Sequence, residues 1–261
     1  MAAVLTERRD ALAIVTLNRP ERRNGVTLGL CLGLYDALRE IAASDARVVV
    51  LRGAGNDFCV GADMGGTQAG EGAAGEAEVA RPAGFDDQSP IYHAALLLHT
   101  MPQITIAAID GGCAGAGMGW AMACDFRFAS PEARFATAFL TVAASGDMGL
   151  IWSLSRIVGG ARAREMLFFP EKLTGAQALE LGFVTRLFPR AVLHDEARKL
   201  GDQLCERDPL ALGMMKANVV SAEELPLSEY IDIETARHLR CAGRPDFAER
   251  MAALFAKSKG K

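Results

Sequence analysis

"DGGCAGAGMGWAMACD", residues 110–125, carries five glycines among small apolar side chains, and its only charges are the aspartates at its two ends. The run "ITIAAI" directly before it has the β-branched character of a buried strand. Because an aspartate and the glycines interrupt the apolar run, we expect a strand, a tight turn and a buried helix rather than a membrane span. Glycines in such a turn let the backbone approach a ligand or another backbone closely, because they have no Cβ.

The segments on either side of this stretch predict an α/β fold. Strand patterns occur in "ALAIVTLNRP", "RVVVLRGAG" and "ITIAAIDGG", and apolar residues at helical spacing span residues 28–44 between the first two. This order of strand, helix and strand is that of a right-handed crossover between parallel strands. Two short strands, "DFRFAS" and "RFATA", are expected to follow residues 110–125.

Helical patterns dominate the chain after residue 147. Thr174 and Gln177 have the spacing of a capping box, and Asp208 before Pro209 predicts the N-cap and first residue of another helix. The last third of the chain is therefore expected to form a layer of helices.

These patterns divide the chain into a core of residues 1–190 and a helical region of residues 191–261. Inside the core, residues 65–89 are rich in glycine, alanine and acidic side chains and lack a strand pattern, which predicts a flexible surface loop. The "GEGAAG" in this loop follows no predicted strand. We therefore interpret it as a chance match to the dinucleotide-binding pattern.

The composition is that of a globular protein. Half of the 261 residues are hydrophobic, and 28 basic against 32 acidic side chains leave a net charge of -4, a balance that does not favour nucleic acid as a partner. Six cysteines without a CxxC pair predict reduced thiols in a cytoplasmic protein. The first ten residues do not resemble a targeting segment, and four scattered histidines predict no metal site.

Two glycine-bearing turns each follow a predicted strand: "NDFCVGADM" after the strand ending at Arg52, and "GGCAGAGMGW" after the strand ending at Asp110. The first N–H groups of a helix have no partner inside it and lie at the positive end of its dipole. If Ala62 and Ala116 present their N–H groups from adjacent strand ends, the pair forms an oxyanion hole. The alternative is that the small residues only allow a helix to pack closely on a sheet.

At these residues the sequence resembles the enoyl-CoA hydratase/isomerase superfamily, the crotonases. The resemblance runs, in the family's order, through "LNRPERRN", "FCVGADM", "AAIDGGCAGAGMGWAMACD", "GDMGLIWSLSRIVGGARA" and "LTGAQALELGFVTRLFP". It implies an α/β crotonase fold, a ClpP-like spiral of ββα repeats with a C-terminal helical layer.

The resemblance also implies a ligand and an assembly. In the family the two turns bind the thioester oxygen of an acyl-CoA, and their donors correspond to Ala62 and Ala116 here. Coenzyme A then enters as part of the substrate, and no separate cofactor is expected. The implied assembly is a homotrimer or a dimer of trimers, with residues 191–261 as the trimerisation region, and neither nucleic acid nor a membrane is an expected partner.

The acid or base is the point at which this chain departs from the family's hydratases. The two glutamates of those enzymes correspond to Gly119 and Phe139, neither of which can transfer a proton. Because the addition of water needs two such groups, their loss favours another reaction. Asp147 in "SGDMGLIW" is the candidate for a single acid or base, since partial burial would raise its pKa. Its plain alternative is an ordinary helix N-cap.

Within the superfamily, the sequence is most similar in motif to 1,2-epoxyphenylacetyl-CoA isomerases and related enoyl-CoA isomerases. The resemblance rests on "AGAG" at residues 114–117, on the pair Ala138-Phe139 and on the aspartate at position 147. The expected activity is an acyl-CoA isomerase that shifts a double bond or opens a ring through a thioester enolate. One carboxyl group removes the proton and returns it elsewhere.

Three other functions stay open. An enoyl-CoA hydratase and an aromatic acyl-CoA dehalogenase use the same scaffold, and the nucleophile of the dehalogenases also corresponds to Asp147. However, the tryptophan of the dehalogenases corresponds to Phe139, and their histidine corresponds to Tyr92, one residue before His93. The third function, from another class, is a protein that binds acyl-CoA or a macromolecular partner without catalysis.

Further residues are expected to contact the substrate. The resemblance places basic contacts to the CoA phosphates at Arg22 and Arg23, although surface arginines are usually only solvated. Lys257, Lys259 or Lys261 could also reach a phosphate, although a solvated tail is the plainer interpretation. The predicted substrate-binding residues are Arg23, Val60, Asp63, Gly115, Phe139 and Trp152.

Overall fold

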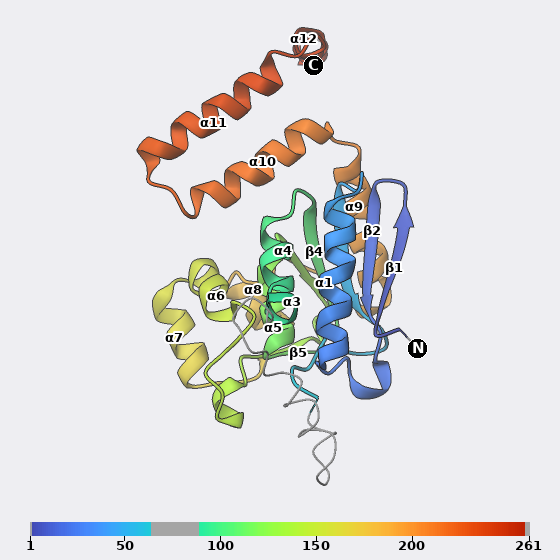
Figure 1. Cartoon of the computed structure of the whole chain (residues 1–261), viewed down its shortest axis with the longest axis vertical. Coiled ribbons are helices and arrows are strands. Elements are labelled where there is room, and N and C mark those ends of the chain that lie inside the picture. Colours follow the sequence, from blue (N-terminus) through green and yellow to red (C-terminus); the bar gives the residue numbers. More distant parts are fainter. Residues whose placement is uncertain (1, 64–88, 259–261) are drawn as a thin grey trace. The chain divides into compact units, whose positions relative to one another are not determined.

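The computed structural model describes residues 2–63 and 89–258 (Figure 1). The predicted loop of residues 65–89 lies outside the described residues except for its last residue, and so do Lys259 and Lys261. The side chain of Lys257 is not described either. The chain falls into two compact units, Met1–Cys205 and Glu206–Lys261.

A six-stranded sheet forms the centre of the first unit, with the strand order β1-β2-β3-β4-β6-β9. Its strands are β1 (Val4–Arg9), β2 (Leu12–Leu17), β3 (Val48–Gly53), β4 (Ile104–Ile109), β6 (Phe126–Ala129) and β9 (Arg186–Leu187). β1 and β2 form an antiparallel hairpin, and every later neighbour in the sheet is parallel. β1 was absent from the sequence prediction because it is an exposed edge strand with the polar sequence "VLTERR".

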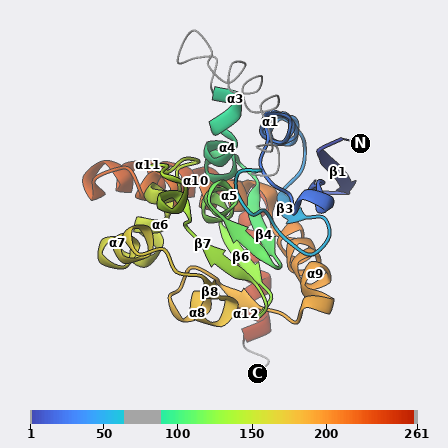
Figure 2. The same ribbon diagram turned by 90° about the horizontal axis from the view of Figure 1, so that it is seen from below.

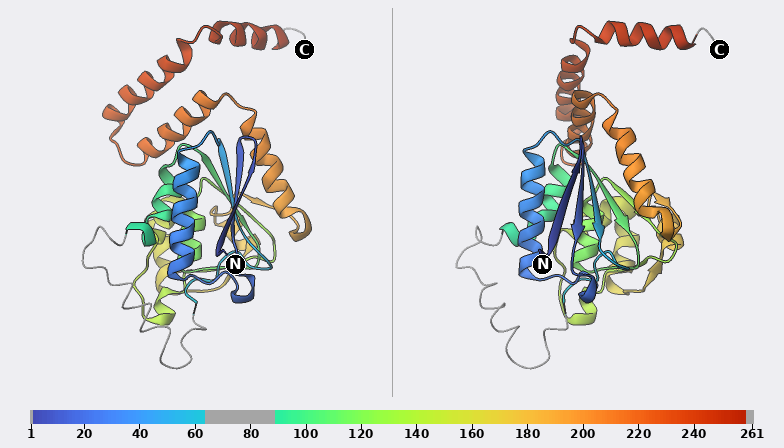
Figure 3. Two further views of the ribbon diagram at one scale, coloured as in Figure 1. Left: turned by 45° about the vertical axis from the view of Figure 1, so that its right-hand side comes forward. Right: turned by 90° about the vertical axis from the view of Figure 1, so that its right-hand side faces the viewer.

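Helices cover both faces of this sheet, as Figure 3 shows for α1 (Leu28–Ala42) and α9 (Leu193–Cys205). On one face, α1 buries the residues predicted from its helical spacing: Leu30, Leu34, Leu38 and Ile41. On the other face, α9 packs so closely that a Cβ on its Gly201 would lie 2.9 Å from Cδ1 of Leu12. α9 therefore belongs to the first unit, which ends at residue 205.

The quoted stretch supplies three elements in succession. It begins at the end of β4, forms the short strand β5 (Gly112–Ala114) and continues as α5 (Ala116–Ala123), of which every residue is buried. β5 opens a second sheet of order β5-β7-β8, whose β7 (Arg134–Ala136) and β8 (Leu173–Thr174) are labelled in Figure 2.

The other helices of the first unit follow in chain order. They are η1 (Pro20–Arg22), α3 (Ser89–Tyr92), α4 (Ala94–Thr100), η4 (Phe139–Val142), α6 (Leu150–Val158), α7 (Gly160–Phe168), α8 (Gly175–Glu180) and η5 (Arg190–Val192). The capping box predicted from Thr174 and Gln177 is present at the start of α8. That prediction is confirmed.

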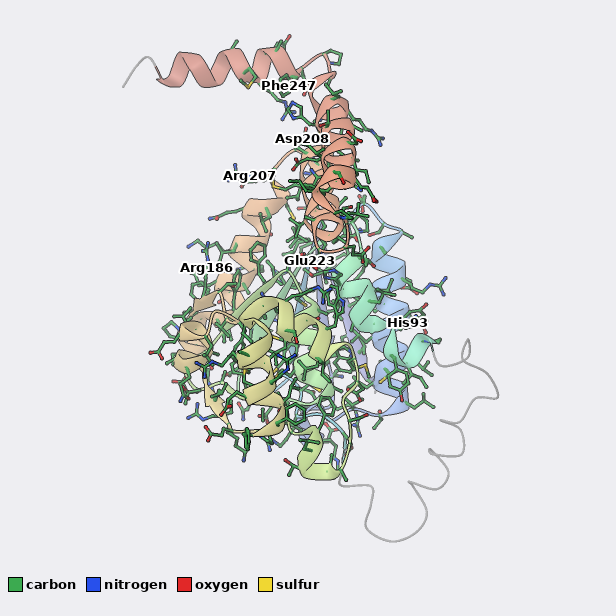
Figure 4. The ribbon with its side chains drawn as sticks, turned by 90° about the vertical axis from the view of Figure 1, so that its left-hand side faces the viewer. His93, Arg186, Arg207, Asp208, Glu223 and Phe247 are labelled. Carbon is green, nitrogen blue, oxygen red and sulfur yellow. The ribbon has the colours of Figure 1, made fainter. Side chains whose placement is uncertain are left out.

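The second unit consists of α10 (Pro209–Ala222), α11 (Leu227–Ala242) and α12 (Phe247–Ser258). Asp208, labelled in Figure 4, caps α10 by accepting the N–H of Ala211 at 3.0 Å, which confirms the predicted N-cap. No helix within the described part of the chain is both long and apolar enough to cross a membrane.

Candidate active site

The two predicted glycine-bearing turns lie side by side and are joined by backbone hydrogen bonds. Phe58 donates its N–H to the carbonyl of Asp110 at 2.8 Å, and Cys59 donates to Gly112 at 3.0 Å. In return, Ala114 donates to the carbonyl of Cys59 at 2.9 Å. The segment after β3 thus continues as a partner of β5, and this pairing brings residues 61–62 and 115–116 together.

Gly61 and Gly115 are required at the point where these turns meet. Both have a positive φ, +84° and +51°, which side chains other than glycine rarely tolerate. A Cβ on Gly61 would also lie 3.1 Å from the carbonyl oxygen of Ala114 and 3.6 Å from Cα of Gly115. The two backbones can approach this closely only because both positions lack a side chain.

The N–H groups of Ala62 and Ala116 follow these two glycines. Ala116 is the first residue of α5, so its N–H has no acceptor one turn earlier. At the other turn, Val26 pairs with the carbonyl of Gly61 and the N–H of Asp63, and this pairing leaves the N–H of Ala62 unused. Within the described part of the chain, neither N–H donates to a backbone carbonyl. Neighbouring, unused donors are what an oxyanion hole requires, and that role stays a prediction.

Asp147 lies three residues before α6 and does not cap it. Gly149 is the N-cap, and no side chain forms a cap hydrogen bond. One carboxylate oxygen of Asp147, Oδ1, is buried and has no hydrogen-bond partner in the described structure. The plain alternative of an N-cap is therefore wrong. Burial raises the pKa of the Asp147 carboxyl group above its ordinary value, because ionisation in a poorly solvated place is unfavourable.

The charge of Asp147 acts on two buried thiols. The pKa of Cys31 on α1 and the pKa of Cys59 in the first turn are each raised to about 12, chiefly by burial and further by the negative charge of Asp147. All six cysteines are free thiols, of which four are buried.

α5 connects the two turns to the segment of Asp147. A Cβ on Gly117 would overlap the carbonyl oxygen of Cys59, and one on Gly119 would lie 2.6 Å from Cβ of Met148. Successive glycines of the quoted stretch are thus the places where other backbones press against α5. Close packing of helix against turn, which the sequence offered as an alternative to the oxyanion hole, is present together with the unused donors.

The Phe139 ring lies between the second turn and the Asp147 segment. Its Cε1 would lie 3.9 Å from a Cβ on Gly115, and its Cδ2 4.0 Å from a Cβ on Gly146. On its other side, Phe139 borders a cavity of about 380 Å³ whose lining includes Ile151 and Leu167. This position fits the predicted contact between Phe139 and the acyl group, which stays a prediction.

Two of the predicted substrate-binding residues form ion pairs. Arg23 donates two hydrogen bonds to Asp57, both 2.9 Å, and Asp63 pairs with Arg19 and Arg22 at 2.9 and 2.5 Å. These ion pairs connect the "RPERRN" segment, residues 19–24, to the first glycine-bearing turn. The sequence prediction missed Asp57 and Arg19, although opposite charges in two segments expected at neighbouring strand ends are a usable signal.

The remaining candidates have the following surroundings. The guanidinium of Arg156 lies over the Trp152 ring, 3.8 Å from its centroid, and the ring of His99 meets the Trp152 ring edge to face, at 5.0 Å between centroids. The described contacts of Trp152 are therefore with α6 and α4. Val60 packs against Gly112. His93, labelled in Figure 4, is exposed at the start of α4. Among the described residues, no group of His, Cys, Asp and Glu side chains has a metal-binding arrangement.

Known sequences match this chain over nearly its whole length. The family model "Enoyl-CoA hydratase/isomerase" matches residues 7–259. A 1,2-epoxyphenylacetyl-CoA isomerase of Escherichia coli is 30% identical over 98% of this chain and 97% of its own length. A probable enoyl-CoA hydratase of Rhodobacter capsulatus is 30% identical, covering 95% of this chain and 93% of its own. A 4-chlorobenzoyl coenzyme A dehalogenase of an Arthrobacter species is 28% identical, covering 97% and 91%.

Solved structures confirm the predicted crotonase fold. A putative enoyl-CoA hydratase of Streptomyces coelicolor superimposes with a TM-score of 0.87 at 29% identity, over 98% of this chain and 92% of that one. A putative enoyl-CoA hydratase of Thermobifida fusca, solved in complex with CoA, superimposes with a TM-score of 0.81 at 26% identity, over 98% and 95% of the two chains.

Proposed function

The chain belongs to the enoyl-CoA hydratase/isomerase family, and we propose that within this family it is an acyl-CoA isomerase. The N–H groups of Ala62 and Ala116 hold the thioester oxygen as negative charge develops on it, and Asp147 transfers the proton. The carboxylate of Asp147 removes a proton from one carbon of the acyl chain, which leaves an enolate or dienolate. The protonated carboxyl group then returns that proton to another carbon, so the overall reaction gains and loses no atoms.

One observation carries this proposal: the buried, unpartnered oxygen of Asp147. An N-cap or an ion pair would hold that oxygen in a hydrogen bond, as Asp208 and Asp63 are held. Leaving it unsatisfied costs stability, about 1–3 kcal/mol for a buried acceptor. A carboxyl group whose pKa is raised by burial is typical of a group that transfers protons.

The same geometry supports isomerisation over the two other reactions. Hydration needs a second acid or base, and the positions of the hydratase glutamates hold Gly119, against which Met148 packs, and Phe139. The histidine of the dehalogenases corresponds to Tyr92, and the neighbouring His93 is exposed at the start of α4. The named relatives include an isomerase, a hydratase and a dehalogenase, so the choice among these activities depends on the site.

The proposed substrate is a CoA thioester, in line with the family match and with the CoA complex of the Thermobifida fusca structure. The proposed assembly is a homotrimer or a dimer of trimers formed through the second unit. α11 has no buried residue in its own chain, and several large apolar side chains of α10 and α11 are exposed: Met215, Val219, Leu227, Ile231 and Leu239. Light scattering behind size-exclusion chromatography tests this assembly, and a monomer at micromolar concentration would contradict it.

The function is tested with 3-enoyl-CoA and crotonyl-CoA as separate substrates in D₂O, followed by NMR. We expect the double bond of the 3-enoyl-CoA to move, and we expect the reaction to be lost in Asp147→Asn. Hydration of crotonyl-CoA at an ordinary enzymatic rate, unaffected by that substitution, would overturn the proposal. Halide release from a halogenated aroyl-CoA would favour the dehalogenase, and tight CoA binding without turnover would favour the non-catalytic alternative.

A further inference from the structure

We infer that Gly119 is a positioning residue for Asp147. Because position 119 has no side chain, the turn that carries Asp147 packs directly against the backbone of α5 at this position. The inference builds on the proposed role of Asp147, and it adds a structural reason for the glycine at position 119.

The contact between α5 and this turn is a direct backbone contact. A Cβ on Gly119 would lie 2.6 Å from Cβ of Met148, 3.1 Å from its carbonyl oxygen and 3.5 Å from its carbonyl carbon. Carbon atoms in packed protein are ordinarily about 3.5–4.0 Å apart. All three distances are to Met148, the residue directly after Asp147, and Met148 is itself only 4% exposed. Even one methyl group at position 119 would therefore displace the turn by about 1 Å.

The turn that carries Asp147 has an uncommon backbone conformation. Gly146, Met148 and Gly149 all have positive φ values, +115°, +49° and +66°, so Asp147 lies among three residues in left-handed conformations. Met148 keeps this conformation although it is not a glycine, at a cost on the order of 1–2 kcal/mol. A displacement of Met148 also moves Asp147, because the two residues are joined by one planar peptide bond.

In this structure the turn of Asp147 occupies the space into which a side chain at position 119 would project. A side chain there therefore requires the turn to move. Introducing a glutamate at position 119 would for this reason displace Asp147 rather than simply add a second acid to the site.

The test combines one substitution with its structural compensation. We expect Gly119→Ala to lower kcat by about 100-fold, the size of effect that a 1 Å misplacement produces, while KM for the CoA thioester changes little. Met148→Gly removes the Cβ that would lie 2.6 Å away and leaves the milder 3.1 Å approach of the carbonyl oxygen. The double variant Gly119→Ala/Met148→Gly should therefore recover at least tenfold of the lost kcat. The matched control is Gly29→Ala, since Gly29 is also a helical glycine but has no neighbouring atom within 4 Å of the position that a Cβ would take.

A second measurement does not depend on turnover: an NMR titration of the Asp147 carboxyl group in the parent and in Gly119→Ala. Displacement toward solvent should bring its pKa down toward the ordinary value. A folded Gly119→Ala variant with unchanged kcat and unchanged Asp147 titration would overturn the inference, as would a kcat loss that Met148→Gly does not relieve. If instead Asp147→Asn keeps full activity while Gly119→Ala shifts the titration, the proposed function fails and the positioning contact stands.

Discussion

Asp57 and Asp147 are both aspartates in turns beside α5 or β5, yet their surroundings are opposite. Asp57 accepts two hydrogen bonds from Arg23 and a third from the N–H of Gly112 at 2.6 Å, and these contacts lower the pKa of its carboxyl group. Asp147 has a buried oxygen without a partner, and burial raises its pKa. The same side chain is thus a fixed structural anion in one turn and a group suited to exchanging a proton in the other. The difference lies in what each carboxylate faces, not in residue type.

The largest effect is expected from removing the proton-transferring group. Asp147→Asn should lower kcat by about 10³-fold, within the range typical of general acid–base catalysis, because the amide cannot accept a proton. Asp57→Asn should lower kcat far less, since Asp57 only holds the Arg23 side chain and the backbone of Gly112 in place. Steady-state kinetics of both variants, with folding checked by circular dichroism, would contradict the comparison if the two losses were equal.

Removing one of the two proposed N–H donors should have the next largest effect. Ala116→Pro deletes the donor at the first position of α5, where a helix tolerates proline. We expect kcat to fall by about 10²–10³-fold, as for the loss of one oxyanion donor. Ala116→Gly keeps the N–H and serves as the control. A proline variant as active as the glycine variant would show that this N–H is not used.

The two aspartates should also differ in how they affect stability as the pH changes. The folded pKa of Asp147 is raised, so ionising it destabilises the protein above that pKa, whereas below the ordinary value of 3.8 both states are protonated and the effect vanishes. Asp147→Asn should therefore raise Tm at pH 7 and leave it unchanged near pH 3. Asp57→Asn should lower Tm at pH 7, with a difference that fades as pH falls through the lowered pKa. Calorimetry over this pH range would contradict the comparison if both substitutions changed Tm in the same direction at pH 7.

The smallest effect is expected from Arg23→Gln. The Arg23 side chain is 64% exposed, and exposed ion pairs typically contribute about 1 kcal/mol or less to stability. A urea titration should therefore show a small loss. If Arg23 also contacts a CoA phosphate, as the sequence suggests, KM for the thioester will rise while kcat stays nearly constant. An unchanged KM would limit Arg23 to its pairing with Asp57.

Much of the framework was predictable because it depends on local pattern. The strands β2, β3 and β4, the helix α1 and the caps at Thr174 and Asp208 each follow from apolar spacing or a short capping motif. β1 was missed because edge strands need no apolar alternation. The domain boundary at residue 190 and the loop at residues 65–89 remain predictions.

The site was predictable in its residues but not in its contacts. The sequence pointed to Ala62, Ala116 and Asp147, but it left an N-cap open as the alternative for Asp147, because a motif shows neither burial nor the direction of a side chain. The contact between Gly119 and Met148 joins residues 29 positions apart by number, so no local pattern encodes it. The same holds for the pairing of Arg23 with Asp57.

The quoted stretch supplies neither the acid nor the base of the proposed reaction. Gly115 leaves space beside the N–H group of Ala116. Cys59 packs against Gly117, and the turn of Asp147 packs against Gly119. Each glycine is a place where another part of the site approaches α5. Its lack of charge reflects this role, because the chemistry is brought to the helix from neighbouring turns.

The central claim is that the carboxyl group of Asp147 is the one whose protonation controls the reaction. The most direct test measures the titration of Asp147 by carbon-detected NMR and compares it with the pH dependence of kcat/KM. We predict that Asp147 titrates above the ordinary aspartate value, that kcat/KM falls as pH drops through the same point, and that Asp57 titrates below that value. A titration of Asp147 at or below the ordinary value, or an acid limb of kcat/KM that persists in Asp147→Asn, would contradict the account.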